Sequence, residues 1–361
     1  MFNDLDDECT GRATACGKAG PRGRTAKYSS AGGQPGMGRR RKRTSSDRSR
    51  VPTRRILMTQ STTPPPMSGV SDETRVLHRI APLGNWKASE GAGPLQMKVA
   101  VLDLETTGLD PQYDEIIEIA VAIIQIDVQG RVIAVESMRT GLQQPSRPIE
   151  PNIAKITGID DAMVAGKRIS PTSIAESLGR AQACLCFNAE FDRRHLEMLV
   201  PEVAEMPWIC AMREVPWRDL GFDGAAQNYL LAQAGMFNPT AHRAADDVAS
   251  LVNLLAHECR DGRTVMAHAL EGAKTSSWRF EASDLPHRLQ KDAYRKGYRR
   301  SYHGVYHKLV REAEHDAEVA WYRELVGRDP TIVPVDWVER YRADWTWKPV
   351  NRKVEVAHWR R

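Results

Sequence analysis

Four carboxylates and one histidine stand out in this chain, because their types and order suit the binding of divalent metal ions. They lie in three short segments: Asp103 with Glu105, Asp192 close to Asn188, and His242 with Asp247. Carboxylates that converge repel one another unless a cation lies between them, and their hard oxygen atoms suit Mg²⁺ or Mn²⁺. Two such ions can activate water and stabilise both the attacking and the leaving oxygen of a phosphodiester. Together the three segments predict metal-assisted hydrolysis.

The first segment follows an apolar run, Lys98–Leu104, that is typical of a buried strand. Asp103 and Glu105 are two residues apart, so their side chains are expected to leave the same face of that strand. A turn with backbone N–H groups free to meet a substrate is predicted next, over Thr106, Thr107 and Gly108. An Asp-x-Glu pattern alone is more often an acidic strand end facing solvent.

In the second segment, Asn188 and Asp192 lie four residues apart where a strand gives way to a helix, so they can share one helix face. Alone, Asp192 could be an ordinary acid in the first helical turn, favoured by the helix dipole.

The third segment holds two adjacent acids. Helical spacing aligns Asp247 with the apolar stripe through Leu251 and Leu254, whereas Asp246 aligns with Ser250 and Asn253, a face expected to be wet. We therefore expect Asp247 to be the metal ligand and Asp246 to be a surface acid. His242 precedes the helix on a loop. A histidine, with a usual pKa of about 6.5, can accept a proton from water near neutrality.

The elements needed to position these residues are strands followed by strand–helix alternation, which predicts a mixed sheet with helices on both faces, an α/β fold. Strands are expected over 98–104, 116–127, 132–138 and 183–187, and helices over 151–157, 171–181, 189–199, 224–235 and 244–259.

The charges of the 361 residues are unevenly distributed. Residues 1–96 carry a net charge of +9, residues 97–260 a net charge of −9, and residues 261–361 a net charge of +5. An acidic body suits a protein that collects divalent cations, and basic flanks suit a polyanionic partner or are simply solvated. We expect residues 1–74 to be a disordered basic and proline-rich segment, and residues 75–96 to connect it to a domain over residues 97–260.

Residues 275–361 are expected to form a small basic module, which holds 13 of the 24 aromatic residues of the chain. Tyrosines alternate with Arg, Lys and His over 294–307, which suggests a surface that binds single-stranded nucleic acid. An equally weighted alternative is that tryptophans of this region, Trp321, Trp337, Trp345 and Trp347, form a small core.

No membrane association is expected, because no run approaches the roughly 20 apolar residues that cross a bilayer. The first residues do not have the pattern of a secretory signal, and the six cysteines show no paired CxxC spacing. We therefore expect a cytoplasmic protein of bacterial type, with no zinc site and no disulfide framework.

At the level of motifs, residues 97–260 resemble the DEDDh family, proofreading-type 3′–5′ exonucleases related to the epsilon subunit of bacterial DNA polymerase III. Val101–Leu109 is similar to the Exo I motif of that family, Phe187–Asp192 to Exo II, and His242 with Asp247 to Exo III. The histidine of the third motif corresponds to the DEDDh branch, and 156–159 resembles a characteristic loop between the first two motifs.

The resemblance implies an RNase H-like fold that holds two Mg²⁺ or Mn²⁺ ions. Asp103, Glu105 and Asp247 would hold one ion, Asp103 would bridge to the second, Asp192 would complete its surroundings, and His242 would be the general base. Five residues would contact the substrate: Thr106, Thr107, Gly108, Thr157 and Asn188. Thr157 stands where relatives carry a histidine near the terminal nucleotide. The expected partner is a single-stranded or frayed nucleic-acid 3′ end, together with a possible DNA polymerase or repair protein.

The resemblance favours release of nucleoside 5′-monophosphates from DNA, in replication proofreading or repair. Two alternatives stay open. The motifs do not distinguish DNA from RNA, so the enzyme could be an exoribonuclease in RNA turnover. A non-catalytic nucleic-acid-binding module is the other alternative, but such a module has no physical need for five matched groups.

Overall fold

The computed structural model of this chain describes residues 74–343, apart from 89, 90, 241, 284 and 302. All but the last residue of the segment 1–74, for which we predicted disorder, lies outside the described residues. Trp345 and Trp347 also lie outside them.

The centre of the main domain is a five-stranded mixed sheet with the strand order β4-β3-β2-β5-β6. Strands β2, β3 and β4 are antiparallel neighbours, whereas β5 pairs in parallel with β2, and β6 in parallel with β5. The strands are β2 (Leu95–Thr106), β3 (Ile116–Asp127), β4 (Val132–Leu142), β5 (Ala183–Cys186) and β6 (Trp208–Cys210). This arrangement confirms the predicted mixed sheet of an α/β fold.

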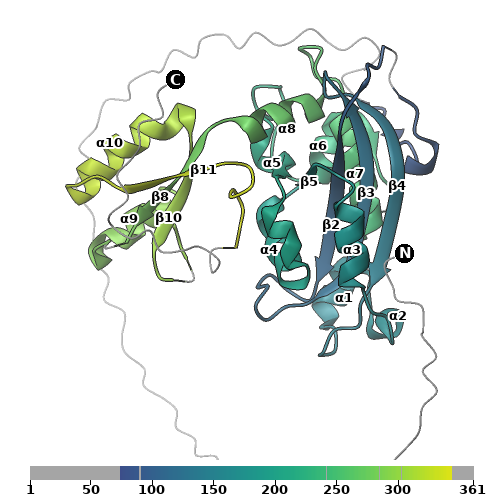
Figure 1. Cartoon of the computed structure of the whole chain (residues 1–361), viewed down its shortest axis with the longest axis horizontal. Helices are drawn as coiled ribbons and strands as arrows, with labels where there is room; N and C mark the ends of the chain where they lie inside the picture. Colours follow the sequence, from purple (N-terminus) through teal and green to yellow (C-terminus); the bar gives the residue numbers. More distant parts are fainter. Residues whose placement is uncertain (1–73, 89–90, 241, 284, 302, 344–361) are drawn as a thin grey trace, which may run out of the picture. The chain divides into compact units, whose positions relative to one another are not determined.

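Helices cover both faces of this sheet (Figure 1). Because side chains alternate along a strand, Val99 and Val101 of β2 face one helix layer, and Ala100 and Leu102 face the other. The first layer contains α6 (Gln227–Gln233), α7 (Ala244–Ala256) and α8 (Val265–Lys274), and the second contains α3 (Pro171–Leu178) and α4 (Ala189–Leu199). Shorter helices are α1 (Pro151–Thr157), α2 (Asp161–Val164) and α5 (Ala211–Glu214), with single 3₁₀ turns at Leu83–Asn85 and Pro201–Glu205.

A segment before the sheet covers part of α7. Strand β1 (His78–Arg79) pairs in parallel with β7 (Met236–Phe237), and the backbone of Ala81 exchanges hydrogen bonds of 2.9 and 3.0 Å with the amide of Asn253. Ser250 accepts a hydrogen bond of 2.9 Å from Asn238. Ser250 and Asn253 are therefore buried, and the prediction that their face of the helix is wet was wrong.

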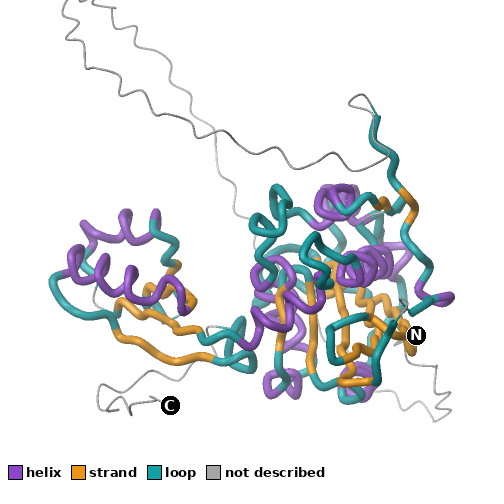
Figure 2. Tube along the Cα trace, turned by 90° about the horizontal axis from the view of Figure 1, so that it is seen from above, coloured by secondary structure: helices purple, strands orange, loops and turns teal. Residues whose placement is uncertain are grey.

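Residues 277–335 form a second, four-stranded antiparallel sheet with the order β11-β8-β10-β9. Two helices lie on one face of this sheet (Figure 2). Its core consists chiefly of aromatic and aliphatic side chains, among them Phe280, Tyr298, Val310 and Tyr322. The elements are β8 (Ser277–Ala282), α9 (Gln290–Arg295), β9 (Arg299–Arg300), β10 (Tyr306–Arg311), α10 (His315–Val326) and β11 (Thr331–Val335), with 3₁₀ turns at His287–Leu289 and Glu312–Glu314.

Of the four tryptophans predicted to form a small core, the structure describes Trp321 and Trp337, and these two pack against different cores. Trp321 stacks on Tyr298 with ring centroids 5.7 Å apart, and Trp278 also packs against the core of the second sheet. Trp337 instead packs against the core of the main domain, and its carbonyl accepts a hydrogen bond of 2.8 Å from the backbone N–H of Trp208 on β6.

A buried arginine joins the residues after β11 to the main domain. The guanidinium of Arg340 forms a salt bridge of 2.9 Å with Glu214 of α5 and donates to the carbonyls of Ala273 and Thr275. The carbonyl of Arg340 in turn accepts a hydrogen bond of 2.9 Å from Arg193 of α4. Within the part of the chain that the structure describes, no helix is long and apolar enough to span a bilayer.

Candidate active site

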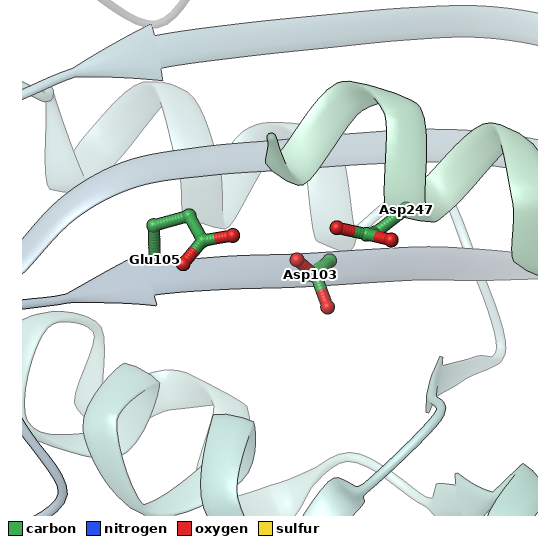
Figure 3. Close-up of side chains that lie close together, drawn as sticks. All are labelled: Asp103, Glu105 and Asp247. Carbon is green, nitrogen blue, oxygen red and sulfur yellow. The ribbon is translucent and has the colours of Figure 1, made fainter. Parts of the chain in front are cut away.

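Three of the four predicted carboxylates meet at one place. One ligand oxygen from each of Asp103, Glu105 and Asp247 lies within 4.8 Å of the others (Figure 3). Asp103 and Glu105 come from the last residues of β2, and Asp247 comes from the first turn of α7. Each of the three side chains is only partly buried, so the cluster remains open to ions and to a substrate.

The alternation along β2 explains why these residues meet. Asp103 and Glu105 continue the face that carries Val99 and Val101, which is the face that α7 covers. The first turn of α7 is fixed by two hydrogen bonds: Asp247 donates its N–H to the carbonyl of Arg243 at 3.0 Å, and its carbonyl accepts from the Gln227 side chain at 2.9 Å. Asp247, and not its neighbour Asp246, belongs to the cluster.

Asp192 approaches from the opposite helix layer. It lies in the first turn of α4, is 97% buried, and accepts a hydrogen bond of 3.2 Å from the backbone N–H of Leu104, between the two acids of β2. Its carboxylate is not within the 4.8 Å cluster, but it is close enough to raise the pKa of Asp103 by repulsion. The end of β2 thus receives acids from both sides of the sheet.

The site strongly favours protonation when no cation is present. Burial, followed by repulsion from Asp192, Asp247 and Glu105, raises the pKa of Asp103 well above its usual value. Burial and repulsion from Asp247 raise the pKa of Glu105 to about 7. Burial likewise raises the pKa of Asp192 to about 7, against the effect of its backbone hydrogen bonds, and it raises the pKa of Asp247.

These carboxylates fit a hard divalent cation. Three carboxylate oxygens converge, and each negative charge is destabilised by its neighbours. A bound cation would offset this repulsion and stabilise the deprotonated carboxylates. Asp103, Glu105 and Asp247 are the residues placed to hold one ion. The charge of Asp192 also acts on Asp103. The donor set indicates a divalent metal without distinguishing Mg²⁺ from Mn²⁺.

His242 is held at the edge of this cluster by its own backbone. Its N–H donates a hydrogen bond of 3.0 Å to Oδ2 of Asp247, and its side chain is exposed. The backbone has a φ of +63°, a left-handed conformation that non-glycine residues rarely adopt and that is concentrated at functional sites. The histidine is therefore anchored to one cluster carboxylate while its imidazole faces solvent.

A buried ion pair that was not predicted from the sequence lies beside the cluster. Glu118 of β3, 97% buried, accepts two hydrogen bonds from Nε and one from Nη2 of Arg243, and also accepts the backbone N–H of Ala244 at 3.0 Å. These contacts fix the start of α7 and so position the neighbouring His242 and Asp247. A signal was present in the sequence: Glu118 is the only charged residue in the apolar run Ile116–Gln125.

The predicted turn after β2 is tightly organised. The hydroxyl of Thr106 donates to the carbonyl of Gly108 at 2.5 Å, and the hydroxyl of Thr107 accepts the N–H of Glu115 at 2.9 Å. A Cβ atom at Gly108 would overlap the carboxylate of Asp114, which would have to move. The turn therefore has one fixed shape next to the carboxylates.

The two other predicted substrate contacts differ. Oδ1 of Asn188 is buried and has no hydrogen-bond partner among the described residues, although Asn188 precedes α4 as its N-cap. A substrate donor could satisfy this atom. The hydroxyl of Thr157, in contrast, donates to the carbonyl of Ile153 and accepts the N–H of Ile159, and its side chain is 96% buried. The structure thus gives Thr157 a part in ending α1, before Gly158 at a φ of +68°.

Comparisons with known proteins agree with this geometry. The model of the RNase T family, described as exonucleases, matches residues 100–255, which include every residue of the carboxylate cluster. Over these residues the chain is similar to the RNase T-type exonucleases. The predicted resemblance to exonucleases is confirmed.

Several known proteins are similar to parts of the chain. The PolC-type DNA polymerase III of Thermotoga petrophila is 41% identical over 110 residues, which are 30% of this chain and 8% of the polymerase. Exonuclease X in complex with 5′-overhanging duplex DNA is 24% identical, with a TM-score of 0.34, over 47% of this chain and 99% of that one. A 3′-exonuclease that recognises a histone mRNA stem-loop is 16% identical, with a TM-score of 0.37, over 46% and 64%.

Proposed function

We propose that the exonuclease domain removes nucleotides one at a time from the 3′ end of DNA and releases nucleoside 5′-monophosphates. The observation that carries this proposal is the convergence of Asp103, Glu105 and Asp247 within 4.8 Å, with His242 bound to one of them and Asp192 beside them. Four acids and one base around the end of a single strand are the groups that metal-assisted phosphodiester hydrolysis needs.

The acids have a shared task in this reaction. Asp103, Glu105 and Asp247 would hold a divalent ion, and Asp103 and Asp192 would hold a second. When bound, such ions supply positive charge that activates water and stabilises the oxygens on either side of phosphorus. The partly buried, mutually repelling carboxylates are preorganised for this because little rearrangement is needed on binding.

His242 would act as the general base that accepts a proton from the attacking water. As water attacks phosphorus, its oxygen forms a new P–O bond, and the bond from phosphorus to the 3′-oxygen of the preceding nucleotide breaks. The imidazole of His242 accepts the proton that water loses, and the leaving 3′-oxygen takes up a proton from solvent. The terminal nucleotide then leaves with a 5′-phosphate. The anchored backbone of His242 keeps the exposed ring near the site where water must stand.

Asn188 would recognise the 3′ end of the nucleic-acid substrate. Its Oδ1 is buried and has no hydrogen-bond partner within the described part of the chain, which costs stability unless a donor fills the site. The 3′-hydroxyl of a terminal nucleotide is such a donor. An internal nucleotide carries a phosphodiester at that oxygen and has no proton to donate. This difference favours action on ends.

The preference for DNA rests on the sequence similarity to a DNA polymerase over 110 residues. The match covers only 8% of the polymerase. We therefore also propose, and do not infer from the match, a role in replication proofreading or repair and a polymerase or repair protein as partner. Hydrolysis of RNA is the second candidate, because the site residues contact the phosphate and the 3′ end and include no group shown to exclude a 2′-hydroxyl.

A substrate panel tests the proposal. Matched DNA and RNA strands, single-stranded, paired and with a mismatched 3′ end, are labelled at the 5′ end and incubated with Mg²⁺. We expect a ladder that shortens from the 3′ end, with DNA degraded faster than RNA, and no ladder with Asp103→Asn. Faster hydrolysis of RNA would replace the DNA assignment, and products cut internally would reject exonuclease action.

A further inference from the structure

A cavity of about 670 Å³ lies between helices of the exonuclease domain and the sheet of residues 277–335. We name it the basic cavity. Its walls come from α4, α5, β8, β9 and β10 and from residues after β11, so both the domain and the second sheet are needed to form it.

Positive charge dominates the walls. Eight Arg and Lys side chains line the basic cavity: Arg194, Arg213, Arg279, Arg299, Arg300, Lys308, Arg340 and Arg342. Salt bridges bring five carboxylates to them, from Glu190, Glu214, Glu281, Glu318 and Glu339. Arg299 and Arg300 take part in none of these five salt bridges. The imidazole of His307 also lines the cavity. Walls lined mainly by cations attract a polyanion.

Two exposed arginines of β9 add the chemistry of single-strand binding. The guanidinium of Arg299 stacks on the ring of Tyr294 at 4.3 Å and donates to the carbonyls of Tyr294 and Tyr298, contacts that leave its charge in place. Arg300 beside it is exposed, and the Tyr294 ring is 59% exposed. Surfaces for single strands combine cations for the phosphates with exposed aromatic rings for the bases.

Helix α4 relates the basic cavity to the carboxylate cluster. Asp192 points from α4 to the end of β2, whereas Glu190 and Arg194, each two residues away from it, lie on the opposite side of the helix and line the cavity. The two sites thus lie on opposite sides of α4, and a helix with its side chains has a diameter of about 10–12 Å. A strand held at the carboxylates must extend beyond this width before its phosphates meet Arg299 and Arg300 of the cavity wall.

We propose that the basic cavity binds backbone phosphates of a single-stranded substrate several nucleotides before its 3′ end. This inference rests on the proposed function, since it assigns the cavity to the strand that the carboxylates shorten. It predicts that long strands bind through both sites, and that a trinucleotide at the carboxylates is too short to reach the cavity.

The test compares two double variants with equal loss of charge. Arg299→Ala with Arg300→Ala removes two cavity cations, and Arg288→Ala with Arg295→Ala removes two exposed cations of the same module that lie outside the cavity. Binding of labelled single strands of about twenty nucleotides is measured by fluorescence anisotropy with Ca²⁺ across a salt series. Separate DNA and RNA arms identify which strand the cavity serves.

We expect the cavity variant to bind the long strand at least about tenfold more weakly at low salt, with a salt slope lower by about 1.4, because two phosphate contacts at about 0.7 each are lost. Binding of a trinucleotide should change less than about twofold, and the control pair should match the wild type throughout. Equal long-strand affinity and equal slopes for the two double variants would overturn the proposal.

Failure of the proposed function is a separate result. Hydrolysis by the wild-type protein is followed with thymidine 5′-p-nitrophenyl phosphate, a small phosphodiester, and with the long strand. Absence of hydrolysis of both would reject the proposed function, whereas the anisotropy comparison needs no hydrolysis and still decides the cavity. A trinucleotide that loses as much affinity as the long strand would also overturn the inference, because it would place these arginines at the carboxylates.

Discussion

Glu105 and Glu118 are direct cross-strand partners on β2 and β3, yet their carboxylates have different surroundings. Glu118 is enclosed by the guanidinium of Arg243, whereas Glu105 turns to the cluster with Asp103 and Asp247. Like charges directly opposite each other destabilise a sheet. Here one of the two is neutralised by an arginine that also fixes the start of α7, and the other is left for a cation.

The Glu118–Arg243 pair is therefore expected to stabilise the site. Glu118→Gln removes the charge that holds Arg243 and the N–H of Ala244, so we expect the free energy of unfolding to fall by about 1–3 kcal/mol and kcat to fall with it. Thermal unfolding and steady-state kinetics measure the two effects. Glu136→Gln is the matched control, because Glu136 forms more exposed salt bridges with Lys98 and Arg180 and should cost less than about 1 kcal/mol. Equal effects of both variants would reject a positioning role.

His242→Ala should lower kcat by about 10²–10⁴-fold if the imidazole accepts the proton of water. Asp246→Asn is the control, because Asp246 lies only four residues after His242 but outside the carboxylate cluster. This variant should retain activity within a few-fold of the wild type. Rates are measured on a 5′-labelled DNA strand at saturating Mg²⁺. A His242→Ala enzyme with nearly full kcat would show that another group takes the proton.

Stability without metal should depend on pH. The folded-state pKa of Glu105 and Asp192 is raised to about 7, whereas carboxylates in an unfolded chain titrate near about 4. Between these values the folded state keeps protons that the unfolded state has lost, so these groups stabilise the protein below about pH 4 and that stability is lost as the pH rises through about 7.

The corresponding measurement is thermal unfolding in a chelator across this pH range, repeated with Mg²⁺. Because protons compete with the cation for the same oxygens, Mg²⁺ should raise the Tm more above pH 7 than below it. Asp103→Asn should weaken both the pH dependence and the Mg²⁺ effect. If Mg²⁺ raised the Tm by the same amount at all pH values, protons and Mg²⁺ would not compete for these carboxylates, and the prediction would be wrong.

Thr157→Val separates a structural role from substrate contact. The Thr157 hydroxyl is engaged by Ile153 and Ile159 within its own turn, so its loss should reduce the free energy of unfolding by about 1 kcal/mol. Asn188→Ala, in contrast, should raise KM for a DNA end with little loss of stability, since Oδ1 of Asn188 has no partner among the described residues. A raised KM for Thr157→Val would instead show that Thr157 contacts the substrate.

Much of this site could be predicted from sequence because the motifs are local. Strand β3 and helices α1 and α4 have the predicted bounds, and the apolar alternation around Asp103 placed both acids of β2 on one face. The choice of Asp247 over Asp246 followed from the stripe through Leu251. Strand β6 was not predicted, since three residues carry too little pattern to separate a strand from a loop.

Contacts between distant segments could not be predicted. Ser250 and Asn253 are buried because residues near 81 and 238 cover them, and nothing in the α7 pattern indicates that cover. The pairing of Glu118 with Arg243 joins residues 125 positions apart. The basic cavity likewise depends on how residues 277–343 pack beside α4. The spacing of apolar residues within each of these segments does not predict such packing.

The central claim is that Asp103, Glu105 and Asp247 bind a divalent cation. Anomalous diffraction from crystals soaked in Mn²⁺ tests it most directly, with Asp247→Asn crystals as the comparison. We expect a strong peak within about 2.0–2.3 Å of oxygens of these three residues, and its weakening or loss in the variant. Crystals that show Mn²⁺ elsewhere, or no peak between these carboxylates, would contradict the account.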